Sequence, residues 1–312
     1  MNMPAQPPAH DQLEFFIEQA AKDQPIRTAV VHPVSHNGLL GAVEAAERGL
    51  IEPILIGPIA KIQAAAEEEG INISGYECID VEHSHAAAEK ACELARLGKA
   101  DALMKGDLGS SELISAIINK QTGLRTERRL SHVFVFDVPH YHKPLIITDA
   151  AINVTPTLDD KKDITQNAID FCHALGITTP KVAVLAAVEK VKAYMPSTID
   201  AACLCKMADR GQITGGILDG PLAFDNAISK QAALDKHINS PVSGEADILL
   251  APDLEAANMI AKQLIYLAEA KSAGLALGAR VPIILTSRAE TPLGRLASCA
   301  LASYMVRHSQ KL

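Results

Sequence analysis

The sequence contains no tryptophan and few other aromatic residues: six phenylalanines and five tyrosines among 312 residues. Nearly half of the chain (48%) is nevertheless hydrophobic. Its core must therefore be built from Ala, Ile, Leu and Val, which suits helices packed in layers on a sheet. The chain also exceeds the usual size of a single hydrophobic core, so we expect two domains.

Long apolar segments are absent as well. No hydrophobic run approaches the length of a membrane span, and the first 25 residues lack the apolar core of a secretory signal. The Pro-rich residues 1–11 are expected to form a loose arm. The six cysteines follow neither a metal-binding nor a disulfide spacing, which favours a cytoplasmic protein with reduced thiols.

Positive charge is scarce, since 29 Lys and Arg residues face 37 Asp and Glu residues and the formal net charge is −8. This balance argues against a nucleic-acid-binding protein, because neutralising a phosphate backbone needs massed cations. It leaves room for an anionic small molecule, which only local cations need to meet.

Metal-ligand patterns are also missing. Asp159, Asp160 and Asp163 could suggest a metal site, but they stand where a helix is predicted to begin, and capping explains them. The close histidine pairs at 83/85 and 140/142 have no Cys or Glu at a usual zinc spacing. We therefore expect no metal cofactor.

What the sequence does contain is an alternation of short apolar runs and helical segments. It predicts βαβ units and a mainly parallel α/β sheet. Strands are expected at 27–33, 53–57, 77–81, 102–105, 132–137, 145–148, 182–186, 216–218, 247–250 and 281–285. Helices are expected at 35–49, 60–69, 84–97, 110–120, 160–175, 197–209, 223–236, 254–272 and 292–307.

The last predicted strand leads into the most informative polar segment. The run Val-Pro-Ile-Ile-Leu at 281–285 breaks into Thr286-Ser287-Arg288, and Thr291-Pro292 then looks like the start of a helix. Ligands bind at the carboxyl ends of strands in open α/β sheets. Arg288 suits phosphate and Ser287 suits an oxyanion, although a strand end with an incidental arginine is the simpler interpretation.

Three further polar groups are candidates for binding an anion. Lys105 precedes Gly106 and small residues that open a helix, where backbone N–H groups could meet an anion or simply cap the helix. Arg129 follows Arg125 and Arg128 in a polar connection, which is either solvated or a phosphate-binding loop. Asn258 and Lys262 lie four residues apart, on one helix face. They could line a cleft or remain a solvated pair.

Taken together, seven segments resemble the phosphate acetyltransferase/phosphate butyryltransferase family. They are MKGDLGSSEL, RRLSHVFVF, PLIITDAAIN, KVAVLAAVE, ADRGQITGGILDGPLAFDNAIS, SGEADILLAPDLEAANMIAKQL and GARVPIILTSRAET. The resemblance runs from about residue 27 to the carboxyl end and looks closer to the butyryl-type branch than to the long acetate-pathway enzymes.

The resemblance implies a fold similar to isocitrate and isopropylmalate dehydrogenases, with two α/β domains, a cleft between them and a homodimeric assembly. The first domain would be discontinuous, formed by residues 1–142 and 277–312, and residues 143–276 would form the second. It also implies reversible transfer of a short acyl group between CoA and inorganic phosphate, with CoA as a substrate and no cofactor.

The resemblance also assigns roles to residues. Ser287 matches the catalytic serine and Arg288 the catalytic arginine that holds phosphate, while Arg129 matches a second phosphate ligand. One position departs from the pattern, because Gly294 stands where acetate-type members carry an acidic residue that deprotonates the CoA thiol. Glu290 is nearby, but the base is left unassigned.

Three alternatives remain open at this point. The preferred acyl group could be butyryl rather than acetyl. A decarboxylating dehydrogenase of the same fold would need a metal and a nicotinamide site. A CoA- or acyl-phosphate-binding protein without activity would explain Gly294, although binding alone does not need an oxyanion donor.

Overall fold

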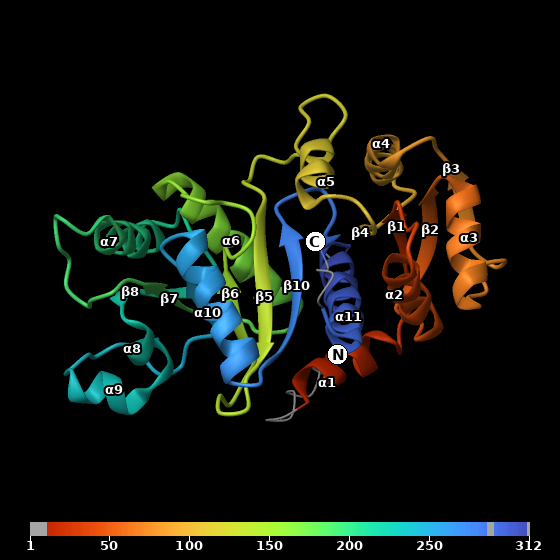
Figure 1. The fold of residues 1–312 in the computed structure, drawn as a ribbon. Helices are drawn as coiled ribbons and strands as arrows, with labels where there is room; N and C mark the ends of the chain where they lie inside the picture. Colours follow the sequence, from red (N-terminus) through yellow and green to blue (C-terminus); the bar gives the residue numbers. More distant parts are fainter. Residues whose placement is uncertain (1–10, 286–289, 311–312) are drawn as a thin grey trace. The chain divides into compact units, whose positions relative to one another are not determined.

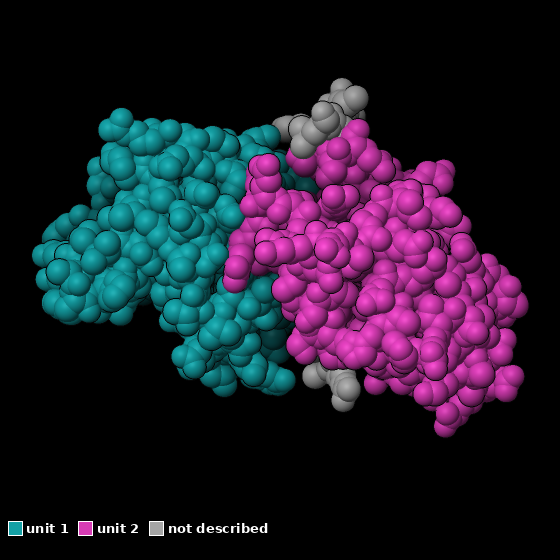
Figure 2. Space-filling view, turned by 90° about the horizontal axis from the view of Figure 1, so that it is seen from above, with its two compact units in different colours: residues 1–12, 131–272 teal, residues 13–130, 273–312 magenta. Residues whose placement is uncertain are grey.

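The computed structural model describes residues 11–285 and 290–310. The chain divides into two compact units, each made of two stretches of sequence (Figure 2). Unit 1 contains residues 1–12 and 131–272, and unit 2 contains residues 13–130 and 273–312. Within the described part of the chain, no helix has both the length and the apolar character needed to cross a bilayer.

Unit 2 is an α/β unit whose strands follow the order β3-β2-β1-β4-β11-β10. All of these strands except β11 are labelled in Figure 1. Its strands are β1 (Ile26–Val31), β2 (Ile51–Gly57), β3 (Glu77–Asp80), β4 (Ala102–Lys105), β10 (Lys271–Leu277) and β11 (Ile283–Ile284). Its helices are α1 (Gln12–Ala20), α2 (His36–Glu47), α3 (Ile59–Glu69), α4 (Ser84–Arg96), α5 (Ser110–Ile117) and α11 (Pro292–Ser309).

The strands of unit 2 are parallel except at β10. Val31 of β1 pairs with Lys105 of β4, and Met104 of β4 pairs with Ile284 of β11. β10 pairs with β11 in the antiparallel sense. Helix α2 packs beside both α3 and α11, whereas α4 packs against α5, so the helices form separate groups around the sheet.

Unit 1 has the strand order β5-β6-β9-β7-β8. Its strands are β5 (Ser131–Asp137), β6 (Leu145–Thr148), β7 (Lys181–Leu185), β8 (Ile217–Leu222) and β9 (Ile248–Leu250). Its helices are α6 (Leu158–Ala174), α7 (Pro196–Asp209), α8 (Phe224–Ile228), α9 (Lys230–Asp235) and α10 (Leu254–Leu267). β5 and β6 are antiparallel, and β6, β9, β7 and β8 run parallel.

The core is built almost entirely from aliphatic side chains, as the composition predicts. Leu103, Leu55 and Ile284 are completely buried in unit 2, and Ile147 and Leu249 are completely buried in unit 1. Only two phenylalanines, Phe136 and Phe171, are among the largest fully buried side chains. The sheet and the helices that pack around it confirm the predicted mixed α/β class.

Two predicted helices were wrong, and two observed elements, α1 and β10, were not predicted. Helix α1 was not expected, because the Pro-rich arm obscures its start. The helix predicted at 223–236 is broken at Ser229, which caps α9 by accepting a hydrogen bond from Ala232 N–H. The helix predicted to reach 272 ends at Leu267, and β10 begins at Lys271, where Ser272 and Gly274 gave little strand signal.

Candidate active site

The strand order of unit 2 reverses between β1 and β4. The chain runs outward from β1 through β2 to β3 and then returns to the other side of β1 to form β4. In doubly wound sheets, such a switch point leaves ligand-binding space outside the carboxyl ends of the two strands. His32 follows β1 and Gly106 follows β4 at this position.

Hydrogen bonds join the connection after β1 to the connection after β4. The backbone N–H of Gly106 donates to the Val31 carbonyl, and the N–H of Asp107 donates to the His32 carbonyl, both at 2.9 Å. The Asp107 carboxylate accepts from the Ser35 N–H at 2.7 Å and from the Ser35 hydroxyl. The two connections therefore form one fixed edge at the switch point.

A close approach of backbone at Gly106 makes this edge possible. A Cβ atom at Gly106 would lie 2.5 Å from the Val31 carbonyl oxygen and 2.9 Å from that of His32. Gly38 is tight for a similar reason, because its Cβ would lie 2.4 Å from Asp107 Oδ2. Glycine is therefore needed at position 106, whereas a side chain at position 38 would require the Asp107 carboxylate to shift.

His32 has an unusual backbone for its residue type, with a φ of 57°. A side chain is tolerated in this left-handed region only at a cost, although His, Asn and Asp adopt it more often than most residues. The ring is held by Nδ1, which lies 3.1 Å from the carbonyl oxygen of Asp107. This position could not be recognised from the sequence, because His32 falls inside the strand predicted at 27–33.

Lys105 ends β4 and is partly buried. Its Nζ lies 3.3 Å from the carbonyl oxygen of Gly106. Because Met104 pairs with Ile284 in parallel register, the chain leaves β11 on the same edge of the sheet as Lys105. The geometry thus brings Lys105 next to the end of the strand that precedes the Ser-Arg pair.

Ser287 and Arg288 themselves lie outside the described residues. The helix that follows them begins as predicted, since the Thr291 side chain accepts a hydrogen bond from the Gly294 N–H and Pro292 occupies the first turn. Arg295 is buried in the same helix, and its Nη1 donates to the Glu290 carbonyl at 3.0 Å.

The arginine-containing connection is anchored to the turn that precedes β11. Arg125 forms an isolated antiparallel bridge with Ala279, and the Thr126 hydroxyl donates to the Gly278 carbonyl at 2.7 Å. The Arg280 N–H donates to the Leu124 carbonyl at 2.9 Å. Arg129 is an exposed residue near the end of this connection. Arg129 is therefore part of a loop that is held in place by hydrogen bonds to the turn before β11.

The other two predicted ligands, Asn258 and Lys262, belong to unit 1. Asn258 Nδ2 donates to the Ala150 carbonyl at 3.3 Å, just beyond the carboxyl end of β6, and Lys262 is exposed on α10. Asp149, next to Ala150, is almost fully buried. Burial raises the pKa of Asp149, and hydrogen bonds from the backbone and from Asn153 oppose that rise.

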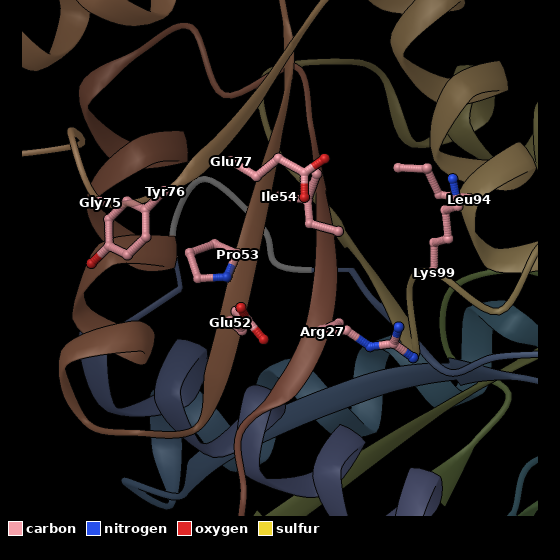
Figure 3. A pocket seen from close by; sticks show the side chains of 9 residues that line it. All are labelled: Arg27, Glu52, Pro53, Ile54, Gly75, Tyr76, Glu77, Leu94 and Lys99. Carbon is pink, nitrogen blue, oxygen red and sulfur yellow. The ribbon is translucent and has the colours of Figure 1, made fainter.

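Two cavities lie away from these strand ends. One, of about 330 Å³, is lined by Arg27, Pro53, Tyr76 and other residues at the amino ends of β1, β2 and β3 (Figure 3). Arg27 in its wall is paired with Asp101 at 2.8 Å. A second, of about 700 Å³, is lined in unit 1 by residues that include Leu145 at the amino end of β6. Both are at the opposite end of their strands from the candidate site.

Three of the cysteines do not have the properties of activated nucleophiles. All six are free. Burial raises the pKa of Cys92 to about 11 and those of Cys205 and Cys299 to about 12. Such thiols stay protonated near neutrality. Within residues 11–285 and 290–310, no group of three or more His, Cys, Asp or Glu side chains is arranged to hold a metal ion.

Comparison with known proteins decides the family. Residues 85–302 match the family model described as Phosphate acetyl/butaryl transferase. The chain is 57% identical to the phosphate acetyltransferase of Rhizobium meliloti over 300 residues, covering 96% of this chain and 94% of that protein. The chain belongs to the phosphate acetyl/butyryl transferase family.

Two further relatives have a lower sequence identity to this chain. The phosphate butyryltransferase of Clostridium beijerinckii is 40% identical over 290 residues, covering 93% of this chain and 96% of that protein. A branched-chain phosphotransacylase structure from Enterococcus faecalis V583 superposes with a TM-score of 0.79 at 27% identity, covering 91% of this chain and 99% of that one. The chain is thus a transferase enzyme, and the similarity to acetyl-type relatives exceeds the similarity to butyryl-type relatives.

Proposed function

We propose that the protein is a phosphate acetyltransferase that reversibly transfers an acetyl group between CoA and inorganic phosphate, giving acetyl phosphate and CoA from acetyl-CoA and phosphate. The observation that carries this proposal is the 57% identity to a phosphate acetyltransferase over nearly the whole of both chains. The candidate edge of unit 2 supports it, because Lys105 supplies a cation beside the carboxyl end of β11.

Ser287 and Arg288 are the proposed catalytic residues. Ser287 would donate a hydrogen bond to the carbonyl oxygen as it gains negative charge, which is the usual task of an oxyanion donor. Arg288 would hold the phosphate with its planar fork of donors, with Arg129 as a second phosphate ligand. Lys105, Asn258 and Lys262 are the other proposed ligands of phosphate and CoA.

The proposed chemistry is direct transfer from one substrate to the other. The CoA thiolate attacks the carbonyl of acetyl phosphate, and phosphate leaves as its negative charge is met by the two arginines. Holding both substrates in line supplies much of the acceleration. The raised pKa values of Cys92 and Cys205 argue against an acyl-enzyme on either of these cysteines, because that route needs an activated thiol.

We further propose the two-domain arrangement of isocitrate-dehydrogenase-like proteins, with residues 1–142 and 277–312 as one domain and 143–276 as the other. A homodimer, a cytoplasmic location and a reaction without metal or nicotinamide belong to the same proposal. Each follows from the family resemblance. Light scattering on the purified protein tests the dimer, and insensitivity to EDTA tests the metal-free reaction.

A second candidate is phosphate butyryltransferase activity, which the 40% identity to the Clostridium beijerinckii protein favours. Each buried methylene of the acyl chain contributes about 0.8 kcal/mol, so the preference depends on pocket size. Thiol release from acetyl-, propionyl- and butyryl-CoA, with and without phosphate, separates the candidates. The account predicts phosphate-dependent release with the highest kcat/KM for acetyl-CoA. A higher value for butyryl-CoA would replace the first candidate with the second.

Absence of phosphate-dependent release with every thioester, from protein shown to be folded, would instead favour a binding protein without activity. Dependence on a divalent metal and NAD(P)H would point to a decarboxylating dehydrogenase. Each of these outcomes rejects the proposed transferase reaction.

A further inference from the structure

The proposed reaction needs a group that removes the proton of the CoA thiol. The thiolate rather than the thiol is the nucleophile, and position 294, at the start of α11, is glycine and offers no side chain. At the switch-point edge, the Asp107 carboxylate already accepts hydrogen bonds from the Ser35 N–H and hydroxyl. Lys105 is a cation that offers donors only.

His32 is the residue at this edge whose chemistry fits a base. Its Nδ1 faces the Asp107 carbonyl oxygen at 3.1 Å, and a carbonyl oxygen can only accept. Nδ1 therefore carries the proton of the neutral ring, and Nε2 keeps a free lone pair. Within the described residues, Nε2 has no hydrogen-bond partner, and His32 is only partly buried.

The position of His32 supports the same role. It follows β1 at the point where the strand order reverses, in a left-handed backbone conformation with a φ of 57°. Strained backbone of this kind gathers at functional sites. Only β4 lies between β1 and β11 in the sheet, and the three strands are parallel. The carboxyl end of β1, which His32 follows, is therefore on the same edge of the sheet as the carboxyl end of β11, which leads to Ser287.

We propose that His32 is the general base for the CoA thiol. This inference rests on the proposed function. Nε2 takes the thiol proton as the S–H bond breaks, the thiolate sulfur bonds to the acyl carbon, and the bond from that carbon to the phosphate oxygen breaks. Phosphate leaves with the electron pair. The imidazolium then releases its proton to solvent. In the reverse direction it gives a proton to the departing thiolate.

Other charged or titratable groups belong to the elements around this edge of the sheet and have to be controlled in the test. Lys105 ends β4 and Asp107 is on the connection that follows it. His36 is at the start of α2, and Asp80 ends β3 and accepts a hydrogen bond from Ile59 N–H. None of these side chains is altered in the His32 variant, and His36 is altered only in the control.

The test is the pH dependence of acetyl transfer from acetyl phosphate to CoA by His32→Asn. Asparagine tolerates the left-handed backbone, and its amide N–H can replace the Nδ1–H donor, but it cannot accept the proton. We expect kcat/KM for CoA to fall by about 10²-fold near neutral pH, as for loss of a general base. The deficit should shrink steadily toward about pH 9, because a free thiol of pKa about 8.5 then ionises by itself.

His36→Asn is the matched control. His36 is an exposed histidine four residues along, paired with Glu69 at 3.1 Å, and its variant should keep the wild-type profile. A His32→Asn enzyme with wild-type kcat/KM, or with a loss that is the same at every pH, would overturn the inference. If His32→Asn does not fold, His32→Gln is read by the same criterion. Failure of the proposed function is distinct, because the wild-type enzyme would then show no phosphate-dependent activity at all.

Discussion

The carboxylate of Asp107 accepts a hydrogen bond from the backbone N–H of Ser35 at 2.7 Å, across 72 residues of sequence. This contact closes the connection after β4 onto the connection after β1. The same carboxylate lies against Gly38 in the first turn of α2. A single acidic side chain therefore fixes the edge of unit 2 at which the strand order reverses.

Gly106→Ala is expected to destabilise the protein by about 1–3 kcal/mol, the usual cost of inserting a methyl group where there is no room. The added Cβ would meet two backbone carbonyl oxygens, which cannot move aside like a flexible side chain. Urea unfolding measures the change. Gly75→Ala is the control, because nothing lies within 4 Å of its Cβ position. Equal stabilities of the two variants would contradict the close approach.

Acid should destabilise the protein through His132, which is buried and whose pKa burial lowers to about 4. The unfolded histidine titrates near its ordinary pKa of about 6.5. Between these values the unfolded state binds more protons, so stability falls as pH drops from about 6.5 to 4, by up to about 3 kcal/mol in total.

The check on this prediction is unfolding free energy against pH for the wild type and for His132→Asn. Between about pH 6.5 and 4, the slope of unfolding free energy against pH should be smaller in the variant by the contribution of one bound proton. His140→Asn, at an exposed position, should keep the wild-type slope. An unchanged slope in His132→Asn would show that other groups carry the acid sensitivity.

Arg288→Ala should reduce turnover far more than it reduces stability, because its guanidinium is proposed to neutralise the transferred phosphate. Ser287→Ala should lower kcat by about 10²-fold, as loss of an oxyanion donor commonly does. Steady-state kinetics alongside thermal unfolding separates the two effects. Near-normal kcat in folded Arg288→Ala would remove that residue from the mechanism, and an unchanged rate in Ser287→Ala would remove the serine.

Arg129→Ala should raise the KM for phosphate, whereas Arg125→Ala should leave it nearly unchanged. Both arginines are exposed on the same anchored connection, and only Arg129 is proposed as a phosphate ligand. The comparison controls for the net charge of the loop. Equal effects of the two substitutions on KM would show a general electrostatic attraction rather than a ligand.

Much of the fold could be predicted from sequence, because strands buried on both faces read as apolar runs. The strand at 102–105 matched β4 in full, and Ser35 and Thr291 cap α2 and α11 as expected. β10 could not be predicted, because Ser272 and Gly274 have little strand propensity and pairing in the sheet overrides it. Local pattern likewise could not show that Ser229 interrupts a helix.

Only part of the candidate site could be predicted from the sequence. Lys105 and the arginine-containing loop carry a charge signal that the sequence displays. His32 and Asp107 do not, because their roles depend on hydrogen bonds between connections about 70 residues apart. The assignment of Ser287 and Arg288 remains a prediction from the family resemblance, since both lie outside the described residues.

The central claim is that this enzyme makes acetyl phosphate from acetyl-CoA and inorganic phosphate. Phosphorus NMR of such a mixture, followed together with release of the CoA thiol, tests it most directly. The account predicts that acetyl phosphate and free CoA appear in equal amounts and only when phosphate is present. Release of CoA without acetyl phosphate, or no release from folded protein, would contradict it.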